Sequence, residues 1–234
     1  MKFEILVSLA LGDGFLNPTN KEKKSFLTIR HSTHQKDYIE WKYNLDKDFW
    51  RYTPRLYNNS IKSKKYYGFK LNSYSNFDCT IIRNLLYPKG KKYISREILD
   101  YLDPLGLAIW FVDDGCIDRP IGRKAMGLLN TYCNSPNAEE ELIIQKYFKE
   151  KWDIHCSINK GHGKHRIRFN NENFIKLVKI IEPYIIDSLK YKINTSTRIN
   201  KKEFPSLEIR SKSNRLSALT KAEDKTAPKI QSEL

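Results

Sequence analysis

The sequence predicts an α+β fold built from two similar halves, each with the element order α-β-β-α-β-β-α. Two observations lead to this prediction. Residues 6–14, LVSLALGDG, match residues 107–115, LAIWFVDDG, at a constant offset of 101. Further features then recur in the same order after each of these segments. We therefore divide the chain into an N-terminal repeat over residues 1–102, a C-terminal repeat over residues 103–200 and a polar extension over residues 201–234.

Each half begins with an apolar helix that ends in Asp-Gly. Asp103 and Pro104 provide an N-cap and a proline at the first helical position of the second copy. Gly14 and Gly115 are expected to end the helices in the left-handed conformation. A segment as apolar as residues 107–112 has to be buried on most sides. We therefore expect the two helices to pack against each other on a pseudo-twofold axis.

The remaining elements of each half follow from their hydrophobic spacing. The predicted pairs are strands at 24–32 and 124–132, helices at 35–49 and 136–152, hairpins at 54–72 and 153–170, and helices that open at 75–77 and 172–174. A lysine stands near the end of each half, Lys92 in GKKYIS and Lys192 in KYKIN. The extension after residue 200 has a single aromatic residue, so we expect a flexible or loosely docked tail.

Charge is the strongest compositional signal. The chain has 42 Lys and Arg against 27 Asp and Glu, for a net charge of +15. Such a field favours a polyanionic partner, most plausibly nucleic acid. The alternative is a Lys- and Asn-rich protein from an AT-rich genome, in which the excess of positive charge has no partner.

The cysteines and the apolar runs indicate the cellular compartment of the protein. The four cysteines are far apart, without CxxC, which disfavours both a disulfide framework and a zinc site and suits a reducing compartment. Apolar runs are too short to span a bilayer, and Glu4 interrupts the opening segment, which otherwise resembles a signal peptide. We expect an intracellular protein without a membrane partner. A mitochondrion, a chloroplast and a bacterial or phage-infected cytoplasm fit equally well.

The packing of the two helices would bring Asp13 and Asp114 together. Two neighbouring carboxylates without a counter-charge raise each other's pKa. A divalent cation such as Mg²⁺ removes this repulsion, because it prefers hard oxygen ligands. A single Asp-Gly after an apolar helix is usually only a helix end with a turn. Two copies in register favour a shared metal site.

The segments LALGDG and IWFVDDG resemble the two motifs of LAGLIDADG homing endonucleases, in the branch that carries both motifs in one chain. The WFxDDG form is most similar to the mitochondrial large-rRNA intron (omega) type. The resemblance covers about residues 3–196. It implies a monomeric, Mg²⁺-dependent endonuclease that hydrolyses both strands of a long, asymmetric DNA target.

The resemblance also implies roles for individual residues. Asp13 and Asp114 would bind the catalytic metal, and Lys92 and Lys192 would approach the same centre. We include the preceding residues, Gly12 and Asp113, in the metal-binding set. Because Gly12 stands where the second motif has Asp113, that carboxylate is not duplicated, and we expect it to act structurally or around the metal.

Four strands per half would form one curved, DNA-binding saddle, as the resemblance implies. The alternation of residues supports this arrangement. Tyr67, Phe69 and Leu71 fall on one face of their strand, while Lys70 falls on the other. The residues expected to face the duplex are basic and belong to such strands: Arg30, Lys62, Lys64, Lys70, Arg166 and Arg168.

Two other classes of function stay open. An intron RNA maturase, or a DNA-binding regulator that does not cleave, could use the same fold. Loss of either motif aspartate would favour those readings, and both are present. A basic RNA-binding structural protein would need neither the paired Asp-Gly helices nor the lysines at the repeat ends, and no RNA-reading aromatic motif is present.

Overall fold

The computed structural model describes residues 1–19, 24–61, 64–119, 124–131, 138–161 and 164–195. All of them lie within one compact unit, Met1–Thr197. The extension predicted over residues 201–234 falls outside these ranges. None of the helices in the described part is long and apolar enough to cross a bilayer.

Both halves have the predicted order of elements. The first half contains α1 (Phe3–Leu11), β1 (Phe15–Pro18), β2 (Ser25–Ser32), α2 (Lys36–Asn44), β3 (Arg55–Ile61), β4 (Lys64–Asn72), α3 (Phe77–Leu86) and α4 (Arg96–Asp100). The second contains α5 (Pro104–Asp114), β5 (Gly115–Asp118), β6 (Met126–Leu129), α6 (Glu139–Trp152), β7 (Ser157–Gly161), β8 (Lys164–Phe169) and α7 (Asn171–Ile181). The α+β class and the αββαββα repeat are confirmed.

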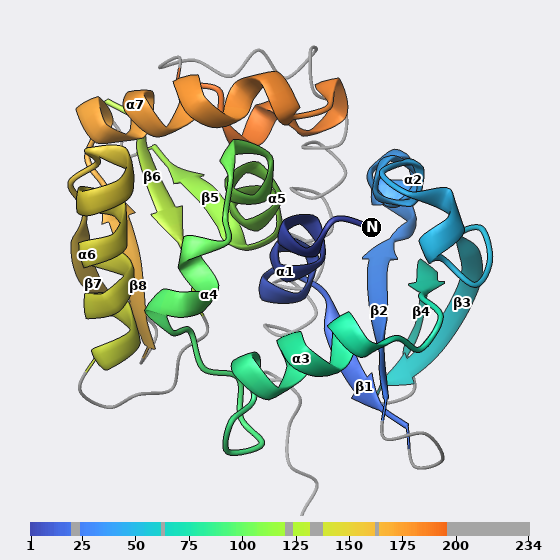
Figure 1. Ribbon diagram of the computed structural model, residues 1–234. Coiled ribbons are helices and arrows are strands. Elements are labelled where there is room, and N and C mark those ends of the chain that lie inside the picture. The colour runs from blue at the N-terminus through green and yellow to red at the C-terminus, as the bar shows by residue number, and fades with distance from the viewer. Residues whose placement is uncertain (20–23, 62–63, 120–123, 132–137, 162–163, 196–234) are drawn as a thin grey trace, which may run out of the picture. The chain divides into compact units, whose positions relative to one another are not determined.

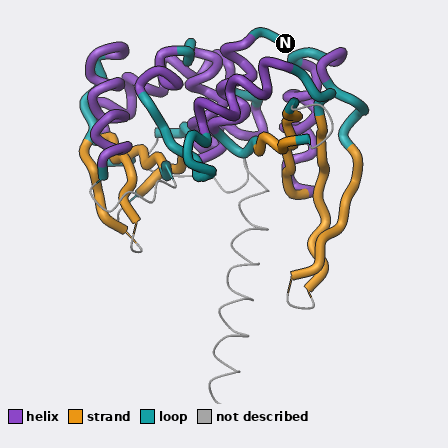
Figure 2. The backbone as a smooth tube through the Cα atoms, turned by 60° about the horizontal axis from the view of Figure 1, so that its bottom comes forward, coloured by secondary structure: helices purple, strands orange, loops and turns teal. Residues whose placement is uncertain are grey.

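Each half has one antiparallel sheet of four strands. The strand orders are equivalent, β1-β2-β4-β3 and β5-β6-β8-β7. The registers match as well, since Phe15 pairs with Thr28 and the equivalent Cys116 pairs with Leu128. Helices α1 and α5 lie side by side between the two sheets (Figure 1). Figure 2 shows the helices gathered on one side, with the strands of both sheets extending from the other.

Several boundaries differ from the sequence prediction. Strand β6 is shorter than residues 124–132, and α2 ends at Asn44 before a 3₁₀ turn over Lys47–Phe49. Helix α6 begins at Glu139, while Pro136 lies outside the described residues. The short helix α4 was not predicted; Ser95 caps it by accepting a hydrogen bond from the Ile98 amide. Two 3₁₀ turns, Glu182–Tyr184 and Asp187–Lys192, follow α7.

The two halves share one hydrophobic core. It includes both central helices, with Leu9 and Leu11 from α1 and Trp110 and Phe111 from α5, all at most 1% exposed. Full burial of a side chain of this size contributes about 1.5–3 kcal/mol relative to its exposure to water. The apolar character of both segments is therefore explained by their mutual packing, which confirms the expected central pair of helices.

The start of α5 is capped as predicted. Asp103 accepts a hydrogen bond from the Gly106 amide at 2.7 Å, and Pro104 occupies the first helical position. The prediction of left-handed glycines at the helix ends is wrong, because Gly115 has φ −88° and Gly14 does not have a positive φ. Glycine is required there by close approach instead. A Cβ at Gly14 would lie 2.2 Å from the Leu9 carbonyl oxygen, and one at Gly115 would lie 2.4 Å from that of Phe111.

Candidate metal centre and nucleic-acid interface

Helices α1 and α5 approach closely because small residues alternate across their contact. A Cβ at Gly106 would lie 2.3 Å from Ser8 Oγ, and a Cβ at Gly12 would lie 2.2 Å from Asp113 Oδ2. Ser8 satisfies its own hydroxyl by donating to the Glu4 carbonyl at 2.7 Å. The small surface around Gly12 thus accepts the larger side chain of Asp113, and the ends of both helices meet.

The two motif aspartates stand at these ends. Asp114 is the last residue of α5, and Asp13 follows α1 after one glycine. Burial, followed by the charge of Asp113, raises the pKa of Asp13 to about 6. Burial also raises the pKa of Asp114 to about 7; Lys92 opposes this shift, whereas Asp113 and Asp13 reinforce it. The two carboxyl groups therefore lie in one electrostatic environment, in which the nearby lysines only partly offset burial and the neighbouring negative charges.

A lysine reaches the end of each central helix. Lys92 Nζ donates to the carbonyl oxygens of Leu11 and Gly12, the latter at 3.2 Å. Lys192 Nζ donates to the carbonyl oxygen of Val112, the equivalent of Leu11, and lies 3.5 Å from that of Gly115. Cations at helix C-termini are favourable, because the carbonyl groups there carry partial negative charge. The sequence-predicted lysines thus lie beside Asp13 and Asp114.

Asp113 has a different environment from its two neighbours. Its side chain is fully buried and forms an ion pair with Lys42, whose side chain is also fully buried. Its carboxylate accepts hydrogen bonds from Lys42 Nζ at 2.8 and 2.9 Å, from the Tyr38 hydroxyl at 2.8 Å and from the Asp13 amide at 2.9 Å. Burial raises the pKa of Asp113, but the Lys42 ammonium, His31 and the hydrogen bonds from Lys42 and the Asp13 amide together outweigh this effect and hold the pKa below its usual range.

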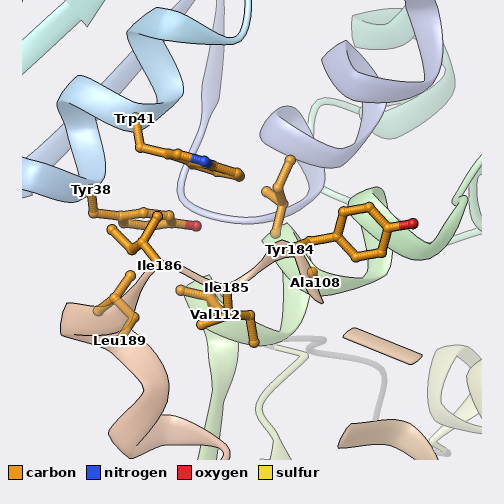
Figure 3. A pocket seen from close by; sticks show the side chains of 9 residues that line it. Tyr38, Trp41, Ala108, Val112, Tyr184, Ile185, Ile186 and Leu189 are labelled. Carbon is orange, nitrogen blue, oxygen red and sulfur yellow. The ribbon is translucent and has the colours of Figure 1, made fainter. Parts of the chain in front are cut away.

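The ring of Tyr38 is held by packing from three elements. It stacks on Trp41 with centroids 5.7 Å apart and lines a small apolar cavity with Val112 of α5 and Leu189 of the last 3₁₀ turn (Figure 3). Burial and the Asp113 charge raise the pKa of the Tyr38 hydroxyl well above its usual value, so it remains a donor. The carboxylate of Asp113 is therefore occupied by three fixed groups.

His31, on strand β2, lies between Lys42 and Asp13. Its Nε2 lies 3.1 Å from Lys42 Nζ, and its Nδ1 lies 3.6 Å from Asp13 Oδ2. Burial, followed by the Lys42 charge, lowers the pKa of His31 to about 3, so the ring is neutral. His31, Lys42 and Tyr38 were not predicted as site residues from the sequence. A signal was present, since helical spacing places Lys42 on the same face as Tyr38 and Ile39, which are buried.

The carboxylates of Asp13 and Asp114 fit a divalent cation. Both are oxygen donors of the kind that Mg²⁺ prefers, and both have pKa values raised by burial and by neighbouring negative charge. Gly12 can offer only its carbonyl oxygen, to which Lys92 already donates. Asp113 has its oxygens filled by hydrogen bonds, which suits the structural role expected for it.

Basic and polar side chains occupy the faces of the sheets opposite the helices. In the first sheet, Leu71 is fully buried, whereas Lys70 is partly exposed on the other face. Lys70 pairs with Arg30 of β2 on one side and with Arg55 of β3 on the other. Residues paired in this way point to the same face of a sheet. The three cations therefore form one row across the sheet.

The second sheet has the predicted alternation too. Ile167 and Phe169 are fully buried, whereas Arg166 and Arg168 are partly exposed on the opposite face. Arg168 pairs with Ser157 of β7, and its guanidinium donates to the Met126 sulfur at 3.0 Å. Four of the six predicted DNA-facing residues therefore lie on the face away from the helices. Lys62 lies outside the described residues, as does the side chain of Lys64.

Two further residues on this face were not predicted from the sequence. Arg55 is exposed, and its guanidinium lies 4.1 Å from the centre of the Tyr52 ring. Tyr66, which shares its face of β4 with Lys70, is 51% exposed. Residue alternation in the hairpin could have identified both.

Comparison with known proteins agrees with this architecture. The model of the LAGLIDADG DNA endonuclease family matches residues 3–177. The chain belongs to this family. Among solved structures, the homing endonuclease I-WcaI bound to its DNA recognition sequence superposes with a TM-score of 0.74, at 22% identity over 84% of this chain and 88% of that one. The LAGLIDADG fold assigned from the two motifs is therefore confirmed.

Curated proteins of several kinds are also similar to this chain. Protein RecA of Mycolicibacterium flavescens is 23% identical over 82% of this chain and 46% of its own length. The cytochrome b mRNA maturase bI2 of Saccharomyces cerevisiae is 31% identical over 56% of this chain and 31% of its own. The intron-encoded endonuclease ai4 of Dictyostelium discoideum is 27% identical over 58% and 82%, respectively. The chain spans about half the length of the first of these relatives.

Proposed function

We propose that this LAGLIDADG protein is a site-specific, Mg²⁺-dependent endonuclease that cuts both strands of a DNA target. The observation that carries the proposal is the meeting of Asp13 and Asp114 at the adjoining ends of α1 and α5, with a lysine at each end. This centre belongs to a fold whose two sheets present basic faces. We expect the basic sheet faces to bind a DNA duplex. The aspartates and lysines at the helix ends would then carry out hydrolysis.

The chain's own groups have separable tasks. Asp13 and Asp114 are the residues that would hold Mg²⁺, which supplies an activated water and stabilises the leaving 3′ oxygen. Lys92 and Lys192 place positive charge beside the same centre, where negative charge develops on the phosphate. Asp113 fixes the Asp13 backbone by accepting its amide hydrogen bond. The sheet faces position the duplex through its phosphates and bases.

The asymmetry of the chain supports a monomer acting on an asymmetric target. Both aspartates come from one polypeptide, so no second copy is needed to complete the centre. The row of Arg30, Lys70 and Arg55 has no equivalent among the described residues of the second sheet, where Arg166 takes the position of Lys70 and pairs with Asn159. Because the two faces carry different side chains, they would favour different half-sites.

The deciding experiment maps double-strand breaks in genomic DNA after incubation with the purified protein and Mg²⁺. Matched samples contain EDTA or the Asp114→Asn variant. We expect breaks at one or a few sites with the wild type, and none in either control. Binding to one sequence without any break would contradict the nuclease proposal and favour a regulator.

A maturase is the second candidate, favoured by the similarity to the bI2 maturase over part of the chain. In that case the protein would bind an intron RNA and assist its folding. An intron-containing transcript mixed with the protein and with the Asp114→Asn variant would test it. Equal stimulation of splicing by both proteins would establish an RNA function that is separate from cleavage.

The proposal includes an intracellular location. Cys79, Cys116 and Cys156 are all unpaired, as expected in a reducing compartment. Immunolocalisation in the host, with organelle markers, would test this part of the proposal.

A further inference from the structure

We propose that His31 is a positioning residue for Asp13: its Nδ1–H holds one oxygen of the carboxylate and leaves the other for the cation. In the described part of the chain this device occurs in the N-terminal half alone, so the two half-centres act unequally on the two DNA strands. The inference rests on the proposed nuclease function, which it deepens by assigning a role to a buried histidine outside the predicted site.

The first step concerns where His31 carries its proton. Its Nε2 lies 3.1 Å from Lys42 Nζ. An ammonium group has only donors, so Nε2 must accept, and the single proton of the neutral ring is on Nδ1. Lys42 cannot turn away, because it also donates to both oxygens of Asp113 and is fully buried. The Lys42–Asp113 ion pair thus selects the tautomer of His31.

The second step is the direction of that proton. Nδ1 faces Asp13 Oδ2 across 3.6 Å, which is longer than a hydrogen bond. The His31 side chain is 1% exposed and fixed, whereas the Asp13 side chain is 40% exposed and can rotate. Rotation of the carboxylate toward Nδ1 would close the contact; Gln35 is the other side chain that hydrogen-bonds to the ring. Donors to a ligating carboxylate orient it and leave one oxygen directed at the metal.

The same geometry excludes direct binding of a cation by the ring. Ligand atoms of Asp13, His31 and Asp113 lie within 4.8 Å of one another, as in a three-ligand metal site. However, a protonated Nδ1 has no lone pair to offer, and the oxygens of Asp113 already accept four hydrogen bonds. Asp13 is therefore the member of this cluster that is available to a cation.

The C-terminal half lacks the equivalent device. The matching sheet registers make Thr131 the equivalent of His31. The Thr131 hydroxyl donates to Glu141 Oε1 at 3.0 Å within the core of that half. Asn130 donates to the main-chain oxygen of Asp114 rather than to its carboxylate, from its amide at 3.1 Å and from its side chain at 3.2 Å. In the described part of the chain, no side chain donates to the Asp114 carboxylate.

The first test needs no activity and no variant. Long-range ¹H–¹⁵N correlation spectra of the ¹⁵N-labelled protein report which ring nitrogen of His31 is protonated. We expect a protonated Nδ1 and an unprotonated Nε2, both without Mg²⁺ and in the DNA complex with Mg²⁺. A proton on Nε2, or loss of the Nδ1 proton when Mg²⁺ is added, would overturn the proposal. Loss of that proton would show that the ring itself ligates the ion.

The second test separates the two ring nitrogens by substitution. His31→Asn keeps a donor near the Nδ1 position, whereas His31→Gln keeps an acceptor near Nε2 for Lys42 but loses the donor to Asp13. We expect His31→Gln to slow cleavage of one strand by about 10- to 100-fold, as for other partners of metal ligands. The slowed strand should be the one that Asp13→Asn affects, while His31→Asn should retain most of the wild-type rate.

The readout is the ratio of the two singly nicked products, measured with each strand end-labelled. Thr131→Val is the matched control at the equivalent position, and it should leave this ratio unchanged. Equal slowing of both strands, or equal effects of His31→Asn and His31→Gln, would make His31 merely structural. A wild type that cleaves neither strand would defeat the proposed function, while the ring spectra would still decide the role of His31.

Discussion

The ammonium of Lys42 donates to both carboxylate oxygens of Asp113, at 2.8 and 2.9 Å, and so joins α2 of the first half to α5 of the second. Both side chains are fully buried. The pair occurs once, because Gly12 stands at the position equivalent to Asp113. Asp113, the acidic residue that occurs in the second motif but not in the first, is thus paired with Lys42, a buried cation from the other repeat.

Lys42→Met should destabilise the protein strongly. Removal of one partner leaves an uncompensated buried charge, which costs about 3–5 kcal/mol. Urea unfolding of the two proteins measures the difference. Lys36→Met on the exposed surface of the same helix is the control, since its contact with Glu40 at 3.6 Å is exposed and contributes about 0.3–0.5 kcal/mol. Similar losses of unfolding free energy in both variants would mean that the buried ion pair contributes no more to stability than the exposed one.

The double variant Lys42→Met with Asp113→Asn sharpens this prediction. Once the carboxylate is neutral, the absence of the ammonium matters less. We therefore expect the combined loss to be smaller than the sum of the two single losses by about 0.5–3 kcal/mol. Additive losses would show that the two groups stabilise the fold independently.

Gly12→Ala should also be destabilising, because Asp113 fills the space beside Gly12. The new Cβ would lie 2.2 Å from Asp113 Oδ2, and this oxygen is held by Lys42 and by the Asp13 amide. Overpacking at such a site costs about 1–3 kcal/mol. The matched control repeats the substitution in an Asp113→Ala background, where the obstructing side chain is gone. A cost that does not fall in that background would point to the backbone instead.

The raised pKa of Asp114, about 7, predicts how stability varies with pH in EDTA. The folded state keeps the proton up to about pH 7, whereas the unfolded chain releases it near its ordinary value, about 3.9. The folded state therefore binds more protons between these values, and its stability falls as pH rises from about 4 to about 7. Mg²⁺, which binds the ionised form, should restore stability at neutral pH.

Asp114→Asn isolates this contribution. His31, whose pKa is lowered to about 3, acts in the opposite sense over the same range, since its stability contribution is lost as pH falls below about 6.5. It is present in both proteins and cancels in their difference. The melting temperature of the wild type minus that of Asp114→Asn should therefore decrease between about pH 4 and pH 7 and then level off. A difference that is independent of pH would contradict the assigned pKa.

The parts of the site that the sequence predicts are those that local pattern determines. Asp13 and Asp114 follow apolar helices in register, and Lys92 and Lys192 recur at the ends of the repeats. Lys42 could not be assigned in this way, because a lysine on an apolar helix face is stable only beside a counter-charge. Here that charge is 71 residues away in the sequence and belongs to the other repeat. Only the tertiary packing of α2 against α5 brings the two together.

The same limit applies to the sheets. Alternation assigned the faces of Lys70 and Arg166 correctly, because a strand buried on one side repeats every two residues. It gave no information on which residues stand side by side, because this depends on strand register. The strand register of the structure shows that Lys70 pairs with both Arg30 and Arg55.

This row of three cations leads to a prediction about DNA binding. Like charges directly opposite one another in a sheet are destabilising by a few tenths of a kcal/mol to about 1 kcal/mol. No described acidic side chain forms an ion pair with Arg30, Lys70 or Arg55. A phosphate would neutralise the row, so the repulsion in the free protein is relieved on binding. Lys70→Gln should therefore make the free protein slightly more stable at low salt and weaken its affinity for duplex DNA.

The salt dependence of binding checks this directly. Each lost phosphate contact lowers the slope of log affinity against log salt by about 0.9. Titration of a labelled duplex with Lys70→Gln at several salt concentrations should show this decrease, whatever the sequence of the duplex. Lys146→Gln is the matched control, because this lysine lies on α6 and contacts Glu150 at 3.7 Å, away from the basic faces. An unchanged slope for Lys70→Gln, or an equal decrease for Lys146→Gln, would show that the duplex does not contact this row.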